Sequence, residues 1–462
     1  EMVGDDLDRS LGLYPTMMIS IGAMIGSGIF VLPALGYKKA GPAVILAYVL
    51  AALVVLPAAL SKAEMATAMP ESGGTYLYID RALGPLFGTI AGIGAWFSLV
   101  FKSSFALVGL GAYLLLFAPL SQGAVVYVAL ALGVLVVALN ISGTKLSGQV
   151  QAVIVTLVVG SLIAYTLNAG IVADPGRFTP FSTHGEAGII TAAAFVFVSY
   201  AGVTKVASVA EEVKDPGRNL PRAILGSMLI MTVLYVAVVG AVVGLSDPSL
   251  LKTGGPGGTA SLTPMADGAG ALLGGVGVLF ISIVAVIALT SMANAGILSS
   301  SRFPLAMSRD DLLPSGLSRI DPRFKTPRNA VLLTGVVLLL LIAFVPVIEL
   351  AKLASAFQIL VFSVINVALV AFREANVPSY EPEFVAPGYP YVQVFGLFAG
   401  LGLLTQMGAV PILGAAGIIV GSALIYALYG RSRTDRTGAI GTILHDRRGE
   451  ADEGLVSTDP DR

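Results

Sequence analysis

Long apolar stretches separated by short polar segments occupy most of the chain. About 20 apolar residues are needed to cross a hydrocarbon core of about 30 Å, and this length recurs along the sequence. We therefore expect an all-α integral membrane protein with about twelve transmembrane helices. The stretches predict helices near residues 14–37, 41–67, 86–118, 123–140, 147–169, 188–213, 221–245, 271–303, 328–347, 350–373, 390–408 and 411–429.

Two of these helices carry small and polar residues where the middle of the membrane is expected. The first reads IGAMIGSGIF at 21–30, and the sixth reads SYAGVT at 199–204, followed by KVASVAEE. Each glycine disfavours a helix by about 1 kcal/mol, and unwound backbone inside a membrane needs a partner other than lipid. Breaks in helices one and six predict an inverted repeat with a binding site at the midplane. Packing seams of small residues are the alternative.

This organisation divides the chain into a ten-helix core and flanking segments. The core spans 14–373, with one repeat at about 14–169 and the other at about 188–373. We expect residues 1–13 to be a cytoplasmic N-terminal segment, residues 390–429 to form helices 11 and 12, and residues 430–462 to be a polar, disordered tail.

The distribution of Lys and Arg predicts the orientation. Of the 27 such residues, 20 fall in segments on the N-terminal side of the membrane, 5 fall on the other side, and two lie within predicted helices. Because cytoplasmic loops are enriched in Lys and Arg, both termini are expected in the cytoplasm of a cell-membrane protein. The start, EMVGDDLDRS, has no basic segment typical of a signal peptide, so the first apolar stretch is expected to be retained.

Composition removes several classes of function. Charged residues make up only 12% of the chain and hydrophobic residues 56%, and cysteine is absent. Disulfides, iron–sulfur clusters and thiolate zinc sites are therefore excluded. The two histidines, His184 and His445, lie in a loop and in the tail, so we expect no metal and no cofactor. A net charge of −1 argues against nucleic-acid binding.

The polarity of the helix breaks indicates the ligand. The first half of helix one ends near Met24 with free carbonyl groups, and its second half begins at Gly28 with free N–H groups. The first half of helix six ends near Val198 and Ala201. Donors for a carboxylate therefore lie near acceptors for an ammonium, and a zwitterionic amino acid fits both.

At these residues the sequence resembles the amino acid–polyamine–organocation transporter family. The resemblance covers about residues 10 to 430, and its motifs are GSGIF at 26–30, AGPA at 40–43, AEMATAMPESGGTYLYI at 63–79, SYAG at 199–202, AEEVKDPGRNLPRAI at 210–224, SRFPLAMSRDDLLP at 301–314 and KTPRNA at 325–330. It implies a five-plus-five inverted repeat, with two further helices often at a dimer or lipid-facing surface.

The resemblance also implies particular site residues. Ser27 and Gly28 would hold the substrate carboxylate, and the carbonyls of Met24, Val198 and Ala201 would hold the amine. In the arginine/agmatine antiporter branch a bulky aromatic gate falls at Val198, which is not aromatic here, so another aromatic residue of helix six is expected in that role. The candidate gates are Phe195, Phe197 and Tyr200, and the expected pocket wall also includes Ile25, Gly26, Ser199 and Gly202.

Two lysines lie within predicted membrane helices, where an ionisable residue costs about 2.5–3.5 kcal/mol and marks function. Lys102 lies in the middle of helix three, and the resemblance aligns it with a position that faces the substrate. Lys205 follows the break of helix six. It is a candidate for coupling, or a structural partner of Glu211 or Glu212.

The sequence leaves more than one candidate for the coupling ion. Some proton-coupled relatives carry a lysine on helix five, but residues 156–159 of this chain offer neither acid nor base. Lys102 could carry the proton instead, or it could bind the side-chain carboxylate of an acidic amino acid. Thr290, Ser291 and Asn294 on helix eight could form a sodium site, although polar side chains also join helices. Proton coupling with neutral amino acids is favoured.

Functions of other classes fit the sequence less well. A channel needs a continuous lined pore, and no repeated filter sequence or charged ring is visible. A membrane-embedded enzyme needs a nucleophile, a metal or an acid–base pair at mid-depth, and the predicted helices contain none. We therefore expect a secondary transporter of amino acids, and not an enzyme.

Overall fold

The computed structural model describes residues 9–70, 74–118, 120–143, 148–434 and 437–441, without the side chains of Thr204 and Glu211. Most of the predicted N-terminal segment and tail, and Lys145, therefore lie outside the described residues. The described part is helical, and its β-structure is limited to an isolated bridge between Leu11 and Val213. The fold class is the all-α membrane protein that the apolar stretches predict.

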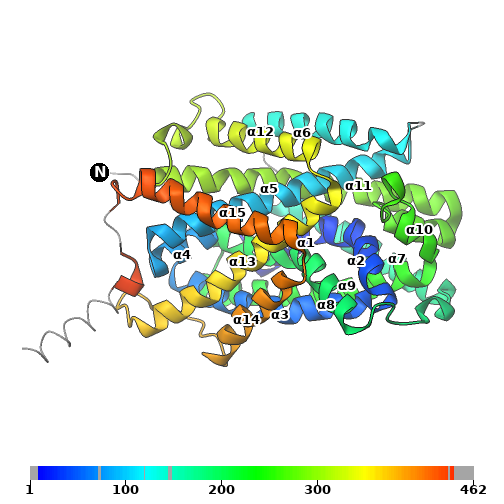
Figure 1. Ribbon diagram of the computed structural model, residues 1–462, viewed down its shortest axis with the longest axis horizontal. Coiled ribbons are helices and arrows are strands. Elements are labelled where there is room, and N and C mark those ends of the chain that lie inside the picture. Colours follow the sequence, from blue (N-terminus) through cyan, green and yellow to red (C-terminus); the bar gives the residue numbers. More distant parts are fainter. Residues whose placement is uncertain (1–8, 71–73, 119, 144–147, 435–436, 442–462) are drawn as a thin grey trace, which may run out of the picture.

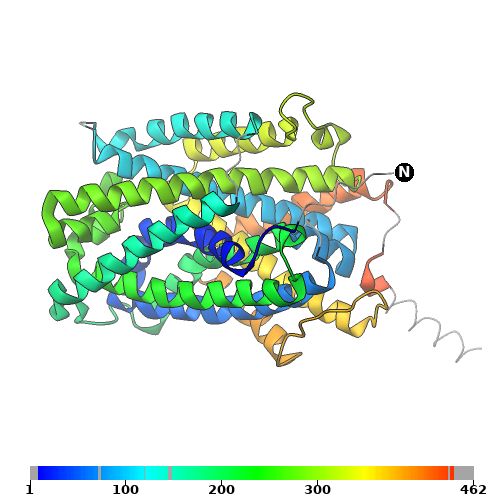
Figure 2. The same cartoon turned by 180° about the vertical axis from the view of Figure 1, so that it is seen from behind.

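The helices run largely side by side along the long axis of the molecule (Figures 1 and 2). Ten of the described segments are long and apolar enough to cross a membrane, and two further apolar helices, α12 and α14, are shorter. In chain order the α-helices are α1 (Leu13–Phe30), α2 (Leu32–Ala40), α3 (Val44–Ala68), α4 (Gly74–Leu83), α5 (Pro85–Leu115), α6 (Val125–Ile141), α7 (Gly148–Val172), α8 (Gly185–Val196), α9 (Pro216–Leu245), α10 (Pro248–Thr253), α11 (Pro264–Arg309), α12 (Arg328–Phe344), α13 (Val347–Glu374), α14 (Tyr391–Thr405) and α15 (Ala409–Ile425).

Short helical segments of other types complete the bundle. The longest, η4 (Phe197–Glu212), is a 3₁₀ helix that continues α8. The others are η1 (Gly41–Ala43), η2 (Gln122–Ala124), η3 (Pro175–Phe178), η5 (Pro256–Gly258), η6 (Ser315–Ser318) and the π-helical η7 (Tyr426–Gly430).

Helices of the first half pack against their counterparts in the second half. The broken helix α1 lies against η4, α3 against α9, α5 against α11, and α6 against α12. An inverted repeat predicts this reciprocal pairing. The core between these pairs is formed by buried apolar side chains and is rich in alanine and valine, which lets the helices approach closely.

The helices predicted from the sequence need two corrections. The stretch at 271–303 underestimates α11, because Leu273 and Gly274 kink the helix without ending it. Gly274 has φ +58°, a conformation that glycine adopts readily, and the helix then continues past Pro304 to Arg309. The helix α4 was not predicted, because it is too short and too polar to register as an apolar stretch.

Candidate substrate site

Helix one is interrupted twice in the structure. Gly26 is the first irregular residue, with φ −37° and ψ −111°. The second is Val31, with φ −130° and ψ −49°, after which α2 begins. Helical geometry therefore resumes at Ser27, one residue before the expected start at Gly28, and this short turn runs to Phe30 before the next interruption.

Side chains from other helices satisfy the carbonyl oxygens beside these interruptions. Buried carbonyls without partners are costly in a membrane, so these bonds explain how the broken backbone is tolerated. The bonds run from Lys102 Nζ to Ala23 O (3.0 Å), from Tyr235 Oη to Met24 O (2.7 Å), from Tyr48 Oη to Gly28 O (2.8 Å) and from Tyr113 Oη to Phe30 O (2.6 Å).

Helix six breaks earlier than the sequence predicts. The α-helical geometry ends at Val196, and the 3₁₀ segment η4 follows over 16 residues with an irregular Val209. Ser355 of α13 stabilises the junction, because its Oγ donates to the carbonyl of Phe195 (2.8 Å) and accepts from the N–H of Val198 (3.2 Å).

The two breaks meet at the centre of the molecule. A Cβ atom on Gly202 would lie 2.5 Å from the carbonyl carbon of Ala23 and 2.7 Å from the nitrogen of Met24. The hydroxyl of Tyr235 also lies 2.8 Å from the carbonyl oxygen of Ser199. Gly202 is therefore required for the close approach of η4 to α1.

Three buried hydroxyl groups near the breaks have no hydrogen-bond partner within the described part of the chain. They belong to Ser27 of α1, Ser103 of α5 and Ser199 of η4. The backbone N–H of Ser27 donates to the Sδ of Met292 on α11 at 3.1 Å, and a thioether is a weak acceptor. Polar groups that could serve a ligand are thus concentrated here.

A cavity of about 550 Å³ begins beside the break of α1. It extends to Asp310 at the end of α11, the end of the molecule at which α4 lies (Figure 1). Among its lining residues are Ala23, Leu99, Lys102, Ser103, Ala201, Gly202, Lys205, Met292, Ala295, Gly296, Ser299 and Phe303.

The expected site residues divide into two groups. Lys102, Ala201, Gly202 and Lys205 border the cavity. The others lie behind its wall as buried residues, namely Met24, Ile25, Gly26, Ser27, Gly28, Phe195, Phe197, Val198, Ser199 and Tyr200. Of the candidate gates, Phe197 packs against Phe362 at 5.7 Å and Tyr200 against Tyr235 at 5.1 Å.

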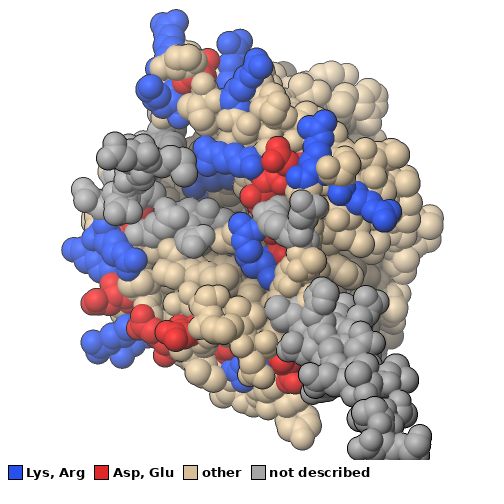
Figure 3. Space-filling view, turned by 90° about the vertical axis from the view of Figure 1, so that its left-hand side faces the viewer, with Lys and Arg blue, Asp and Glu red and all other residues tan. Residues whose placement is uncertain are grey.

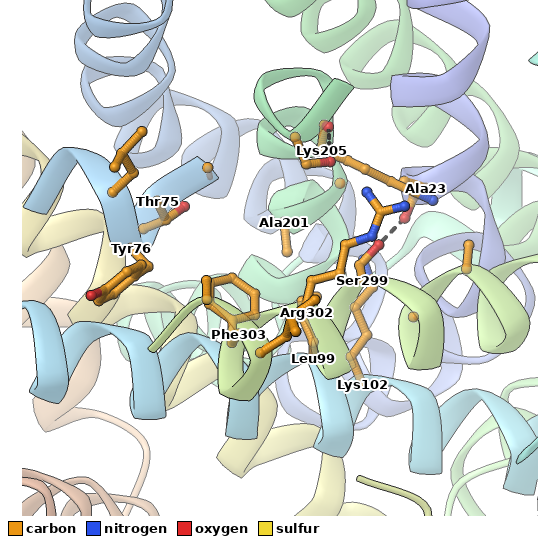
Figure 4. Close-up of a pocket in the computed structure, with 18 of the residues that line it drawn as sticks. Ala23, Thr75, Tyr76, Leu99, Lys102, Ala201, Lys205, Ser299, Arg302 and Phe303 are labelled. Carbon is orange, nitrogen blue, oxygen red and sulfur yellow. Dashed lines mark hydrogen bonds between the residues drawn. The ribbon is translucent and has the colours of Figure 1, made fainter. Parts of the chain in front are cut away.

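Positive charge exceeds negative charge along the cavity. Lys102, Lys205 and Arg302 reach into it from α5, η4 and α11 (Figure 4). The lining also includes Lys62, Arg81 and Arg309, with Glu212 and Asp310 as the acidic side chains among the described residues. Figure 3 shows the corresponding end of the molecule, where Lys and Arg side chains gather.

Sequence reasoning missed several residues of this region. Tyr235 and Ser103 lie in apolar stretches that give no sign of their polar contacts, and Met292 is an ordinary core residue by sequence. Arg302 was indicated by the sequence, because it belongs to the motif at 301–314 that supports the family resemblance. In the structure its side chain lines the cavity from the C-terminal part of α11 (Figure 4).

The candidate ion-site residues on α11 lie apart from the cavity lining. Thr290 is exposed on the outer surface, Ser291 is half-buried, and Asn294 Oδ1 accepts a hydrogen bond of 2.7 Å from Asn140. In the described chain no group of three or more His, Cys, Asp or Glu side chains is arranged to hold a metal. Of the two expected partners of Lys205, Glu211 has no described side chain, and Glu212 lines the cavity.

Glu64, in the motif at 63–79, anchors the loop after α13. Its buried carboxylate binds the guanidinium of Arg373, with 3.0 Å from Nε to Oε1, and accepts from the N–H of Ala386 at 2.7 Å. The hydroxyl of Tyr380 donates to it at 3.0 Å. Burial, and then the charge of Glu64, raise the pKa of Tyr380, so this hydroxyl stays protonated as a donor.

Comparison with known proteins agrees with this architecture. Residues 11–431 match the family described as amino acid permease. The branched-chain amino acid permease BcaP of Bacillus subtilis is 32% identical over 448 residues, covering 93% of this chain and 94% of the relative. The methylthioribose transporter of the same organism is 30% identical, with 93% and 95% covered, and BcaP of Lactococcus lactis is 30% identical, with 90% and 93% covered.

The chain therefore belongs to the amino acid permease family, within the amino acid–polyamine–organocation superfamily. It is a multi-pass membrane transporter of amino acids, and not an enzyme.

Proposed function

We propose that the protein is a secondary active transporter, a symporter or exchanger, that binds a zwitterionic amino acid between the breaks of α1 and η4. The carboxylate faces the N–H groups of Ser27 and Gly28, and the ammonium faces the carbonyls of Met24, Val198 and Ala201. The unpartnered hydroxyls of Ser27 and Ser199 support this position. Because Met24 O accepts from Tyr235, the incoming ammonium would share or replace that bond.

Lys102 is the proposed coupling group, and one observation carries this assignment. Its Nζ lies 3.0 Å from the carbonyl oxygen of Ala23, beside the break and at the cavity wall. A protonated lysine makes a strong, charge-assisted bond to this carbonyl. Loss of the proton weakens the link between α5 and the broken helix. Proton occupancy would thus control how firmly α1 is held, and a proton is preferred to sodium.

Small neutral or branched apolar amino acids are the proposed substrates. The cavity wall near the breaks includes several small residues, namely Ala23, Ala201, Gly202, Ala295 and Gly296. Two of the relatives are named as branched-chain amino acid permeases. Dibasic substrates are disfavoured, because the cations that line the cavity would repel them.

Two substitutions of Lys102 test the coupling role in proteoliposomes with an imposed pH gradient. Lys102→Met should remove the pH dependence of leucine uptake, because no group remains to carry the proton. Lys102→Arg should do the same, because its guanidinium keeps its proton throughout. A pH profile that is unchanged in both variants would refute proton coupling through Lys102.

An acidic amino acid is the second candidate substrate. The excess of cationic side chains along the cavity favours it, with Lys102 as the partner of the side-chain carboxylate. In this case Lys102→Met should shift preference from glutamate to leucine, whereas Lys102→Arg should retain glutamate. Equal glutamate uptake by the wild type and Lys102→Met would exclude this alternative.

We further propose that both termini face the cytoplasm and that the cavity described above is the cytoplasmic pathway. The positive charge at this end of the molecule supports the orientation (Figure 3). The outer faces of α14 and α15 are apolar and largely exposed, which suits contact with lipid or with a second copy in a homodimer.

A further inference from the structure

Met292 occupies the space beside the break of α1. Its side chain is 5% exposed, and its Sδ accepts a hydrogen bond of 3.1 Å from the N–H of Ser27. A Cβ atom on Gly26 would lie 1.9 Å from this sulfur. The Met292 thioether therefore occupies the space that a side chain at residue 26 would need.

The hydrogen bond from the Ser27 N–H to the Met292 Sδ is weak for a buried backbone donor. Sulfur is a poor hydrogen-bond acceptor, and the hydroxyl of Ser27 has no partner within the described chain. A carboxylate oxygen at the same position would accept from the N–H in a stronger, charge-assisted bond. The local arrangement of donors thus fits an anionic oxygen better than the sulfur that occupies it.

Methionine is suited to a reversible occupancy of this kind. It is unbranched and has three rotatable bonds, and Met292 lines the cavity, which offers space for another rotamer. The side chain could therefore swing towards the cavity without displacing α11.

We propose that Met292 is an internal stand-in for the substrate carboxylate, which must displace it from the N–H of Ser27 on binding. This inference rests on the proposed carboxylate site at Ser27 and Gly28. Without substrate, the Met292 thioether excludes water from the break of α1. When substrate binds, the thioether must leave this position, and the loss of its contacts reduces the binding free energy of the substrate. Met292 is accordingly a determinant of affinity for the carboxylate end of the ligand.

A graded series of substitutions at residue 292 separates this role from simple packing. Met292→Leu keeps the volume but removes the acceptor, whereas Met292→Gln supplies a stronger acceptor. Each variant is purified as the full chain in detergent, and the dissociation constants of leucine and of its decarboxylated analogue, 3-methylbutylamine, are measured by thermal shift. Met307→Leu is the matched control, since Met307 is buried on the same helix but packs near Gly92.

The stand-in role predicts opposite shifts in the two variants. One hydrogen bond corresponds to about three- to tenfold in a binding constant, so leucine should bind about threefold more tightly to Met292→Leu and about tenfold more weakly to Met292→Gln. Binding of the amine, which has no carboxylate, should be unchanged in both, and Met307→Leu should match the wild type.

Two results would overturn the inference, and they differ in meaning. If the wild type prefers leucine to the amine but the two variants leave this ratio unchanged, Met292 only fills space while the carboxylate site stands. If the wild type binds leucine and the amine equally, the carboxylate site itself is wrong, and the role of Met292 fails with it.

Discussion

The hydroxyl of Tyr235 on α9 lies 2.7 Å from the carbonyl oxygen of Met24, and the same hydroxyl lies 2.8 Å from the carbonyl oxygen of Ser199. A phenol has one proton, so it donates to one of the two carbonyls at a time. The ring is held by Tyr48 at 5.0 Å and by Tyr200 at 5.1 Å. One side chain thus joins the breaks of both discontinuous helices.

Tyr235→Phe should destabilise the protein by about 1–3 kcal/mol, because it leaves a buried carbonyl without a donor. The melting temperature in detergent measures this loss. Tyr165→Phe is the control, since Tyr165 is also buried but its hydroxyl lies 3.5 Å from the carbonyl of Met265, too far for a strong bond. Equal melting temperatures for both variants would show that Tyr235 does not brace the breaks.

Substitution of Gly28 tests the proposed carboxylate site. From sequence, Gly28→Leu should abolish transport without unfolding the protein, but a Cβ here would lie 2.7 Å from the hydroxyl of Tyr235 and 3.0 Å from the Cβ of Ser199. Leucine is therefore expected to disturb the fold. Gly28→Ala is the smaller change, since it adds only this Cβ and requires a shift of the Tyr235 hydroxyl. It should abolish most leucine uptake, and its melting temperature in detergent shows whether the protein stays folded.

Gly160→Ala is the matched control for this experiment, because nothing lies within 4 Å of the added methyl group. It should retain wild-type uptake. In the wild type, 3-methylbutylamine should compete poorly with leucine, because it has no carboxylate. Full transport by Gly28→Ala would place the substrate elsewhere.

Removal of the Glu64 carboxylate should have a large effect on stability. Glu64→Gln breaks a buried ion pair with Arg373, and such a loss costs about 3–5 kcal/mol. Arg328→Gln is the control, because Arg328 is 60% exposed and lies 3.9 Å from Asp321, and exposed pairs contribute about 0–1 kcal/mol. Similar melting temperatures for the two variants would contradict this ranking.

Topology can be tested with single introduced cysteines, since the native chain has none. Ser315 in η6 and Thr253 at the end of α10 are both exposed. An impermeant thiol reagent added to intact cells should label Thr253→Cys, and should label Ser315→Cys only after the membrane is opened. Labelling of Ser315→Cys from outside would reverse the proposed orientation.

The broad architecture was predictable because lipid imposes a simple rule on sequence. Apolar stretches of spanning length indicated the membrane helices, and small and polar residues at mid-depth indicated that the first and sixth helices are interrupted. The sequence could not show where the irregular backbone begins, because this depends on bonds from distant helices. Tyr235 and Ser355 fix the observed geometry, and both lie in stretches that read as ordinary membrane helix.

The site was only partly predictable for the same reason. Lys102 and Lys205 stood out because charge is rare within a membrane helix, and both border the cavity. Met292 and Ser103 carry no such signal, since their significance arises from contacts across the bundle. The polar residues of α11 attracted attention by composition, yet Asn294 bonds to Asn140 and Thr290 is exposed on the outer surface.

Counterflow in proteoliposomes tests most directly whether the protein moves amino acids by alternating access. Vesicles are loaded with unlabelled leucine, alanine or glutamate and diluted into a trace of the same labelled amino acid. A transporter should accumulate label transiently above its equilibrium level for at least one of the three, because the excess unlabelled amino acid inside competes with the entered label for the site and slows its exit. Label that rises only to equilibrium, whatever the internal amino acid, would contradict the account.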